Sequence, residues 1–208
     1  MQKFKDLSIS KKFFYAFGII VVLVSLLSYY MIDNILFLDD SNTKLYEQGA
    51  KPLEILNRIL INVDKTKNNL YEEILDPINV MNNIQERKEA SQEVSKYVKE
   101  FNNSIDKSNT ELNKSYEQYL EERKSYISNI EKYENMVISG DIEGAKTFLM
   151  GELTTSISNY NNAIKNMMET IDKSSSNLSD KNTLEAKKVT KNGIIISVVV
   201  VLLLIIIG

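Results

Sequence analysis

Histidine, cysteine and tryptophan are absent from this chain of 208 residues, and proline occurs only twice. A chain without histidine lacks the side chain most often used for proton transfer near neutral pH and for binding metals. A chain without cysteine can form no disulfide and offers no thiol nucleophile. Two prolines and seven glycines among long charged stretches are typical of a protein built from long helices.

The motifs of common catalytic and cofactor sites are also missing. The sequence contains no G-x-G-x-x-G motif, no P-loop and no loop with the spacing of calcium ligands. Neighbouring acids such as Glu72 and Glu73 would point to different faces of a helix, as solubilising charges do. We therefore expect no catalytic residue, no metal site and no cofactor, and we expect that the chain is not an enzyme.

Two long apolar runs stand out against this polar background. Residues 13–32 carry no charge and are long enough, as a helix, to cross the roughly 30 Å hydrocarbon core of a bilayer. Residues 193–208 are apolar apart from Ser197 and would span about 24 Å at the rise of a helix. The first run follows lysines, as in a signal peptide, but it is longer than a signal-peptide core and ends in bulky residues. Both runs are predicted to be transmembrane helices.

Charge predicts how the chain is oriented in the membrane. Four lysines in the first twelve residues favour a cytoplasmic N-terminus. The predicted parts are a cytoplasmic arm (1–12), a first transmembrane helix (13–33), an extracytoplasmic domain (34–192) and a truncated second transmembrane helix (193–208). The chain is thus expected in the plasma membrane. Its central domain has a net charge of about −5, which argues against nucleic acid as a partner.

Apolar residues in the central domain recur at alternating steps of three and four, the pattern of packed helices. The first helix would continue out of the first apolar run, kink or restart near Pro52 and stop near Asp76 and Pro77. A later break in the pattern predicts another helix start, because Ser108 and Glu111 have the spacing of a capping box.

Two further breaks complete the predicted helices. At residues 139–141 the sequence Ser-Gly-Asp suits a left-handed stop followed by an N-cap. The polar run at residues 174–183 has the composition of a linker, but Leu178 keeps the apolar pattern, so we predict that the last helix passes through it. Four helices joined by short turns predict an all-α, antiparallel up-down-up-down four-helix bundle flanked by two transmembrane helices.

Three stretches carry a resemblance to a known family. They are KKFFYAFGIIVVLVSLLS at residues 11–28, YEQGAKPLEILNRI at residues 46–59 and SGDIEGAKTFL at residues 139–149. Their order and spacing resemble the sensory half of a methyl-accepting chemotaxis protein, the bacterial transmembrane chemoreceptor. The resemblance covers essentially the whole chain.

The resemblance implies a homodimer in the lipid bilayer that senses a small molecule, or a ligand-loaded binding protein, outside the cell. Binding would shift a signalling helix toward a HAMP linker and a methylated coiled coil, cytoplasmic domains that this chain lacks. The same sensor can precede a histidine kinase or a cyclic-dinucleotide enzyme. A different alternative is a two-span membrane protein whose bundle only binds a partner or acts as a spacer.

One face of the predicted first helix offers a candidate ligand site. It carries two cations and two amides at i, i+4, i+7 and i+11, namely Arg58, Asn62, Lys65 and Asn69. Arginine matches the planar geometry of a carboxylate. In the family that the chain resembles, anionic ligands bind near the interface of two first helices, and by the same analogy Thr154 could hydrogen-bond the ligand. The alternative is an ordinary solvated helix face.

Two arginines fall at core-facing positions of the pattern, where a charge needs a partner. Arg87 and Arg123 could contact a ligand between helices, but pairing with acids is the more common arrangement. The acids that lie near them in sequence are Glu86, Glu93, Glu121 and Glu122.

Three tyrosines recur every seven residues and would form one row, at Tyr119, Tyr126 and Tyr133. Such a row could stack on an aromatic or cationic ligand. We expect instead that the rings fill the core and that their hydroxyl groups reach the surface of the bundle.

The chain is expected to be the front end of a longer receptor, which sequencing of the gene beyond the codon for Gly208 would test. We expect the frame to continue through basic residues into a HAMP-like helix pair and a long Glu- and Ala-rich coiled coil. A kinase or cyclase domain would keep the sensor but change its output. An immediate stop codon would favour the partner-binding alternative.

Overall fold

The computed structural model describes residues 8–75, 80–106 and 109–207, and every regular element in these ranges is helical. The chain divides into two compact units. One consists of the described parts of Met1–Lys44 and Leu178–Gly208, and the other is Leu45–Asn177. The predicted all-α class is confirmed for the described residues.

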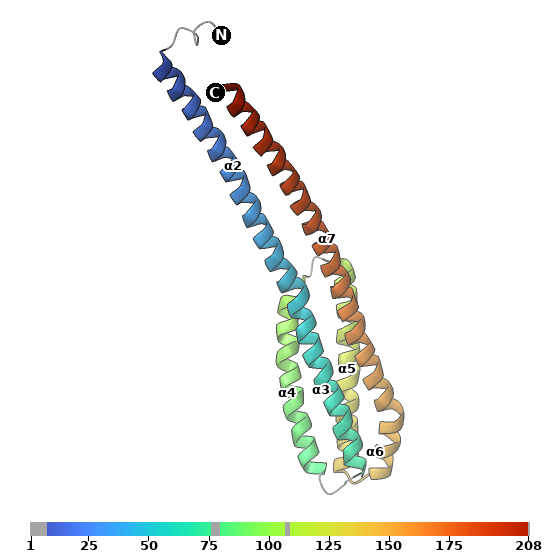
Figure 1. Ribbon diagram of the computed structural model, residues 1–208. Helices are drawn as coiled ribbons and strands as arrows, with labels where there is room; N and C mark the ends of the chain where they lie inside the picture. The colour runs from blue at the N-terminus through green and yellow to red at the C-terminus, as the bar shows by residue number, and fades with distance from the viewer. Residues whose placement is uncertain (1–7, 76–79, 107–108, 208) are drawn as a thin grey trace. The chain divides into compact units, whose positions relative to one another are not determined.

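The first unit consists of two helices that lie side by side (Figure 1). They are α2 (Ile9–Leu45), except for its last residue, and the C-terminal part of α7 (Thr154–Ile207). A Cβ atom added to Gly193 would lie 3.9 Å from Met31 Sδ, so the two helices touch there. Large apolar side chains nevertheless stay exposed on both helices, for example Phe14 at 81% and Ile205 at 71%.

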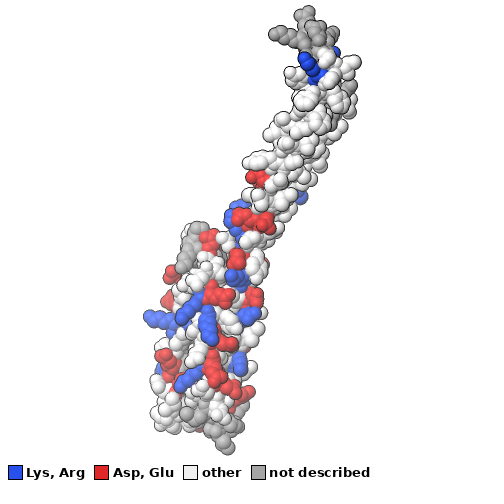
Figure 2. All heavy atoms as spheres, turned by 90° about the vertical axis from the view of Figure 1, so that its left-hand side faces the viewer, with Lys and Arg blue, Asp and Glu red and all other residues white. Residues whose placement is uncertain are grey.

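The exposed apolar surface of this unit agrees with a position in lipid. Within the described residues, one continuous helical stretch, Ile9–Ile74, contains a segment long and apolar enough to cross a membrane. Figure 2 shows a long surface without charged side chains over part of this unit, whereas blue and red residues are interspersed over the other unit. The second predicted span and the orientation of both stay predictions.

The second unit is a four-helix bundle in which successive helices run in opposite directions (Figure 1). Its helices are α3 (Lys51–Leu75), α4 (Val80–Ser104), α5 (Thr110–Ile138), and α6 (Ile142–Phe148) followed by the first part of α7. Two short π-helical segments, η1 (Tyr46–Ala50) and η3 (Leu149–Leu153), precede α3 and α7. The predicted four-helix bundle is therefore confirmed.

Burial in the bundle follows the predicted steps of three and four. On α3, for example, Leu56, Ile59, Val63 and Leu70 are each at most 1% exposed. On α7, Ile157, Tyr160, Ile164 and Met167 are buried in the same way. Stripes of this kind stabilise a helix mainly by packing, since isolated helices are marginal in water.

The predicted break near Pro52 takes the form of the π-helical segment η1. A proline has no N–H group and its ring crowds the carbonyl group one turn earlier, so it disturbs a regular α-helix. The wider turn of η1 ends at Ala50, and α3 begins with Lys51 directly before Pro52. The predicted stop at Asp76 and Pro77 lies outside the described residues.

The other helix ends lie where the sequence predicted them, except for the N-cap of α5. Gly140 has a φ of 83°, and Asp141 caps α6 by accepting a hydrogen bond from Gly144 N–H at 3.0 Å. Residues 174–183 are helical, as predicted. The cap of α5, however, is Asn109 rather than Ser108, because Asn109 Oδ1 accepts hydrogen bonds from the N–H groups of Glu111 and Leu112 at 3.1 Å each. Ser108 itself lies outside the described residues.

A close approach at Gly49 predicts a specific loss of stability. A Cβ atom at Gly49 would lie 2.3 Å from Ser175 Oγ and 3.0 Å from Ser175 Cβ, so Gly49→Ala must turn the Ser175 hydroxyl away and crowd its Cβ atom on α7. We expect Gly49→Ala to lower the free energy of unfolding by about 1 to 3 kcal/mol, measured by urea unfolding of the purified chain in detergent.

Gly151 provides the matched control for this variant, because it also lies in a π-helical segment but its added Cβ would meet no atom within 4 Å. Gly151→Ala should change stability by less than about 1 kcal/mol. Combining Gly49→Ala with Ser175→Gly should restore part of the loss. Equal stability of Gly49→Ala and the unsubstituted chain would contradict the close packing.

Candidate functional site

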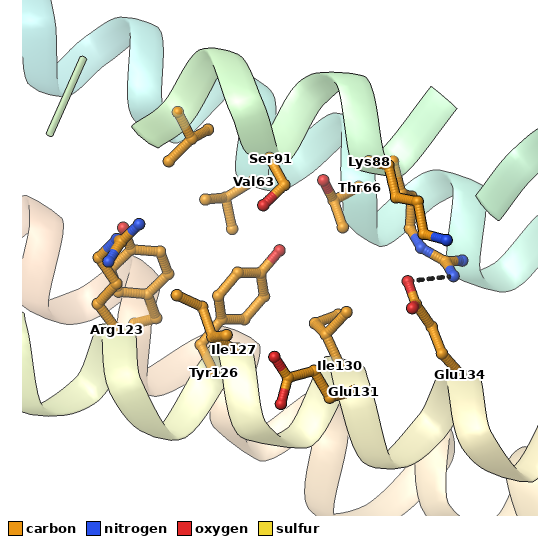
Figure 3. A pocket seen from close by; sticks show the side chains of 13 residues that line it. Val63, Thr66, Lys88, Ser91, Arg123, Tyr126, Ile127, Ile130, Glu131 and Glu134 are labelled. Atoms are coloured by element: carbon orange, nitrogen blue, oxygen red, sulfur yellow. Dashed lines mark hydrogen bonds and ion pairs between the residues drawn. The ribbon is translucent and has the colours of Figure 1, made fainter. Parts of the chain in front are cut away.

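A cavity of about 180 Å³ lies inside the bundle, lined by residues of α3, α4, α5 and α7 (Figure 3). Its apolar wall is formed mainly by Val63, Val94, Ile127 and Ile130. Its polar groups are Thr66, Arg87, Lys88, Ser91, Arg123, Tyr126, Glu131 and Glu134. Apolar walls with a few converging polar groups are the usual composition of a small-molecule site.

Arg87 lies at one end of this cavity and is only 2% exposed. Its Nη1 donates to Glu73 Oε1, and its Nη2 donates to Glu134 Oε1 at 3.1 Å. The guanidinium group therefore joins α3, α4 and α5. The sequence correctly predicted an acid partner for Arg87 but named the wrong ones, because the partners come from other helices and not from neighbours in sequence.

Arg123 marks the opposite end of the cavity from Glu134 (Figure 3). Its Nε atom is buried, and its guanidinium group has neither an ion pair nor a hydrogen bond to any residue in the described ranges. The predicted pairing with Glu121 or Glu122 is therefore wrong. A buried donor without an acceptor is unfavourable, and in the described residues the Nε–H groups of both Arg87 and Arg123 are in this position.

The tyrosine row lies inside the bundle. The prediction that its hydroxyl groups reach the surface is wrong. Tyr119 and Tyr133 are fully buried. Tyr160 OH donates to Tyr119 OH at 3.3 Å, and Tyr133 OH donates to the Leu70 carbonyl oxygen at 3.4 Å. The core accepts these rings because each buried hydroxyl finds a partner there.

Tyr126 is the member of the row that borders the cavity. Its ring stacks on Tyr160 of α7, with 5.0 Å between centroids and 24° between planes. Burial raises the pKa of Tyr126 to about 12, although a hydrogen bond with Thr66 and the charges of Arg87 and Arg123 act in the opposite direction. Its phenol is therefore protonated near neutral pH and can donate a hydrogen bond.

The face of α3 predicted from sequence is largely occupied by its own contacts. Arg58 is exposed, and its Nη2 donates to Glu54 Oε1 at 2.7 Å. Asn62 Nδ2 donates to the Arg58 carbonyl oxygen at 2.9 Å. Asn69 is buried, with its Nδ2 3.5 Å from Glu86 Oε2.

The two remaining predicted residues lie apart from one another. Lys65 is exposed and borders a shallow polar hollow in which Glu86, Glu89 and Glu93 are the acidic residues. Thr154 Oγ1 donates to the Leu149 carbonyl oxygen at 2.5 Å and lies 3.1 Å from Tyr71 OH. The structure thus does not bring Thr154 to the Arg58 face by any contact, and ligand binding by these residues stays a prediction.

Comparison with known proteins identifies the family of this bundle. The family described as "Four helix bundle sensory module for signal transduction" matches residues 6–186. The chain belongs to this family. The match confirms the resemblance to the sensory region of methyl-accepting chemotaxis proteins, and no curated protein and no solved structure matches the chain.

Within this sensory module, the sequence alone indicated the cavity only indirectly. Arg87 and Arg123 were singled out because charges at core-facing positions are unusual. Nothing in the spacing distinguished the arginine that finds two acids from the one that finds none. That difference depends on which side chains of α3 and α5 oppose each arginine in the folded bundle.

The two cavity arginines should respond differently to substitution. Arg87→Met leaves the buried carboxylate of Glu73 without a cation, so we expect a loss of about 3 to 5 kcal/mol in the free energy of unfolding. Arg123→Met removes a guanidinium group that has no partner in the described residues, and stability should fall by less than about 1 kcal/mol or rise. Urea unfolding of the chain in detergent would measure both.

A double variant separates the ion pair from the packing of Arg87. Replacing Glu73 as well, in Arg87→Met with Glu73→Leu, removes the unpaired charge and should recover most of the stability. If Arg87→Met proved as stable as the unsubstituted sensory module, the buried ion group would not hold the three helices together.

Proposed function

We propose that the chain is the sensory region of a bacterial transmembrane chemoreceptor. Its bundle binds a ligand outside the cytoplasm and transmits a conformational change across the membrane for chemotaxis. The observation that carries this proposal is the match of residues 6–186 to a sensory module for signal transduction. The chain itself supplies no catalysis, and its output comes from cytoplasmic signalling domains.

The exposed apolar helices support the membrane part of this proposal. Residues such as Phe14, Val22 and Val198 are between 52% and 81% exposed in the first unit. Such surface is unfavourable in water but not in lipid. Lys11 and Lys12 directly precede the apolar run, which favours a cytoplasmic position for the N-terminal arm.

The internal cavity supports the sensing part. A ligand can change a conformational equilibrium only if it binds one arrangement more tightly than the other. A cavity lined by all four helices of the bundle meets this condition, because its shape depends on how the helices pack. The stacked rings of Tyr126 and Tyr160 connect its wall to α7, the helix that also carries the second apolar run.

The module is proposed to act as a homodimer whose two copies share the signal. Dimerisation would place two signalling helices under one ligand-dependent equilibrium, as in symmetric receptors. A small molecule or a ligand-loaded binding protein would then shift this equilibrium. Nucleic acid is not among the proposed partners, because the net charge of the chain is negative.

Cysteine labelling in intact cells would test the proposed orientation. The chain has no cysteine of its own, so single substitutions report one position each. Ser128→Cys, on the exposed surface of α5, should react with a membrane-impermeant maleimide in intact cells. Ser10→Cys, in the N-terminal arm, should react only after the membrane has been permeabilised.

The unsubstituted chain serves as the blank in this experiment, and total labelling in detergent shows that both cysteines can react. Labelling of Ser10→Cys but not of Ser128→Cys in intact cells would reverse the orientation. Labelling of neither before permeabilisation would place the bundle in the cytoplasm and contradict an extracytoplasmic sensor.

A further inference from the structure

We propose that the cavity beside Arg123 binds a small organic carboxylate with an apolar body, an inference that rests on the proposed sensory function and specifies its ligand. The charge of the ligand is set by Arg123. The shape of the ligand is set by the aliphatic and aromatic side chains of the cavity wall.

Three cations line the cavity, and of these Arg123 is the one that is partly buried and has no ion pair in the described residues, since Lys88 is exposed and Arg87 is paired. At the other end, Arg87 pairs with both Glu73 and Glu134. Glu131 is exposed to solvent, where its charge is screened. Both arginines have a buried Nε–H group without an acceptor in the described residues, but Arg87 has two ion pairs there, whereas the partly exposed Arg123 has none. A carboxylate would supply both the acceptor and the opposite charge, and arginine binds this planar group with two parallel hydrogen bonds.

The rest of the wall fits an apolar body with one or two polar contacts. Val63, Val94, Ile127 and Ile130 offer aliphatic surface along the cavity. Figure 3 shows the hydroxyl groups of Ser91 and Tyr126 directed into the same space, whereas Thr66 Oγ1 donates to the Asn62 carbonyl oxygen at 2.9 Å. Because these hydroxyls line one region, they can bind a second polar group of the ligand or a bridging water.

The volume restricts the size of the ligand. The cavity of about 180 Å³ has room for a small molecule. An acid the size of benzoate or 3-methylbutanoate fits such a space, whereas a nucleotide is too large for it. Lys88 and Glu131 border the cavity and are themselves exposed, so the cavity reaches the surface between α4 and α5.

Calorimetric titration of the full chain in lipid nanodiscs tests this proposal. We expect benzoate and 3-methylbutanoate to bind saturably, with one molecule per chain. Benzamide has nearly the shape of benzoate without its charge and should bind at least tenfold more weakly, a difference of about 1.4 kcal/mol. Arg123→Gln should weaken benzoate binding by the same factor or more, and Arg123→Lys should weaken it less than Arg123→Gln.

Lys124→Gln is the matched control, because it removes a positive charge from the next residue of α5, which is exposed and does not line the cavity. It should leave the affinity for benzoate unchanged within twofold. Thermal unfolding without ligand should show that Arg123→Gln melts within a few degrees of the unsubstituted chain, so that lost binding cannot be ascribed to lost fold.

Three results would overturn the proposal. One is the absence of saturable binding of both acids, and another is equal affinity for benzoate and benzamide. The third is benzoate binding that survives Arg123→Gln but is lost in Arg58→Gln, which would move the anion site to the exposed face of α3. Each of these results concerns binding alone and does not depend on the orientation of the chain in the membrane.

A crosslinking measurement separates failure of this site from failure of the sensory function. Met31→Cys and Gly193→Cys, combined in one chain, place two thiols where α2 and α7 touch. We expect benzoate to change their rate of disulfide formation, and Arg123→Gln to abolish that change. Binding without any change in rate would keep the site but contradict transmission, whereas correct orientation without binding would contradict only the site.

Discussion

The buried contact of Arg87 with Glu73 and Glu134 is the constraint on which the rest of the bundle depends. Removing three charged groups from water is costly, and the cost is offset only when the groups meet with good geometry. Side chains from α3, α4 and α5 must therefore come together at this one level. Apolar stripes tolerate a helix that rotates or slides slightly, but an ion group does not. The contact thus fixes the relative position of three helices at one end of the cavity.

A cluster of aromatic rings joins α4, α5 and α7, as the ion group joins α3, α4 and α5. Phe101, Tyr119 and Tyr160 pack with centroid distances of 5.7 to 5.8 Å between neighbours, and Tyr126 stacks on Tyr160. Burial raises the pKa of Tyr119 to about 12, so its hydroxyl stays neutral and can share a hydrogen bond with Tyr160. Between the ion group and this cluster lies the cavity, where α3 and α4 present small side chains such as Thr66 and Ser91 to α5. The cavity therefore lies between a buried ion group and a cluster of packed aromatic rings.

Features that depend on neighbouring residues in the sequence were predicted correctly more often than contacts between helices. The left-handed stop at Gly140 and the helix through residues 174–183 depend on nearby residues, and they were predicted from residue type and from the apolar spacing, respectively. The cap of α5 was missed by one residue, because asparagine is as good an N-cap as serine and Asn109 Oδ1 accepts from Glu111 N–H and Leu112 N–H. The partners of Arg87 and the isolation of Arg123 could not be predicted. They depend on the rotation and height of each helix against its neighbours, and a stripe of apolar residues leaves both undetermined.

The contrast between Arg58 and Arg123 shows why an internal site suits a sensor better than a helix face. The side chain of Arg58 is 54% exposed and already paired with Glu54, so water and salt would weaken its attraction for an anion. Arg123 is partly exposed, but its Nε–H group is buried, and a charge that is partly removed from water is screened less. A face on α3 alone also keeps its shape when the helices repack, because all its residues move together. A cavity lined by four helices changes shape with every repacking, so a ligand bound there can favour one arrangement over another.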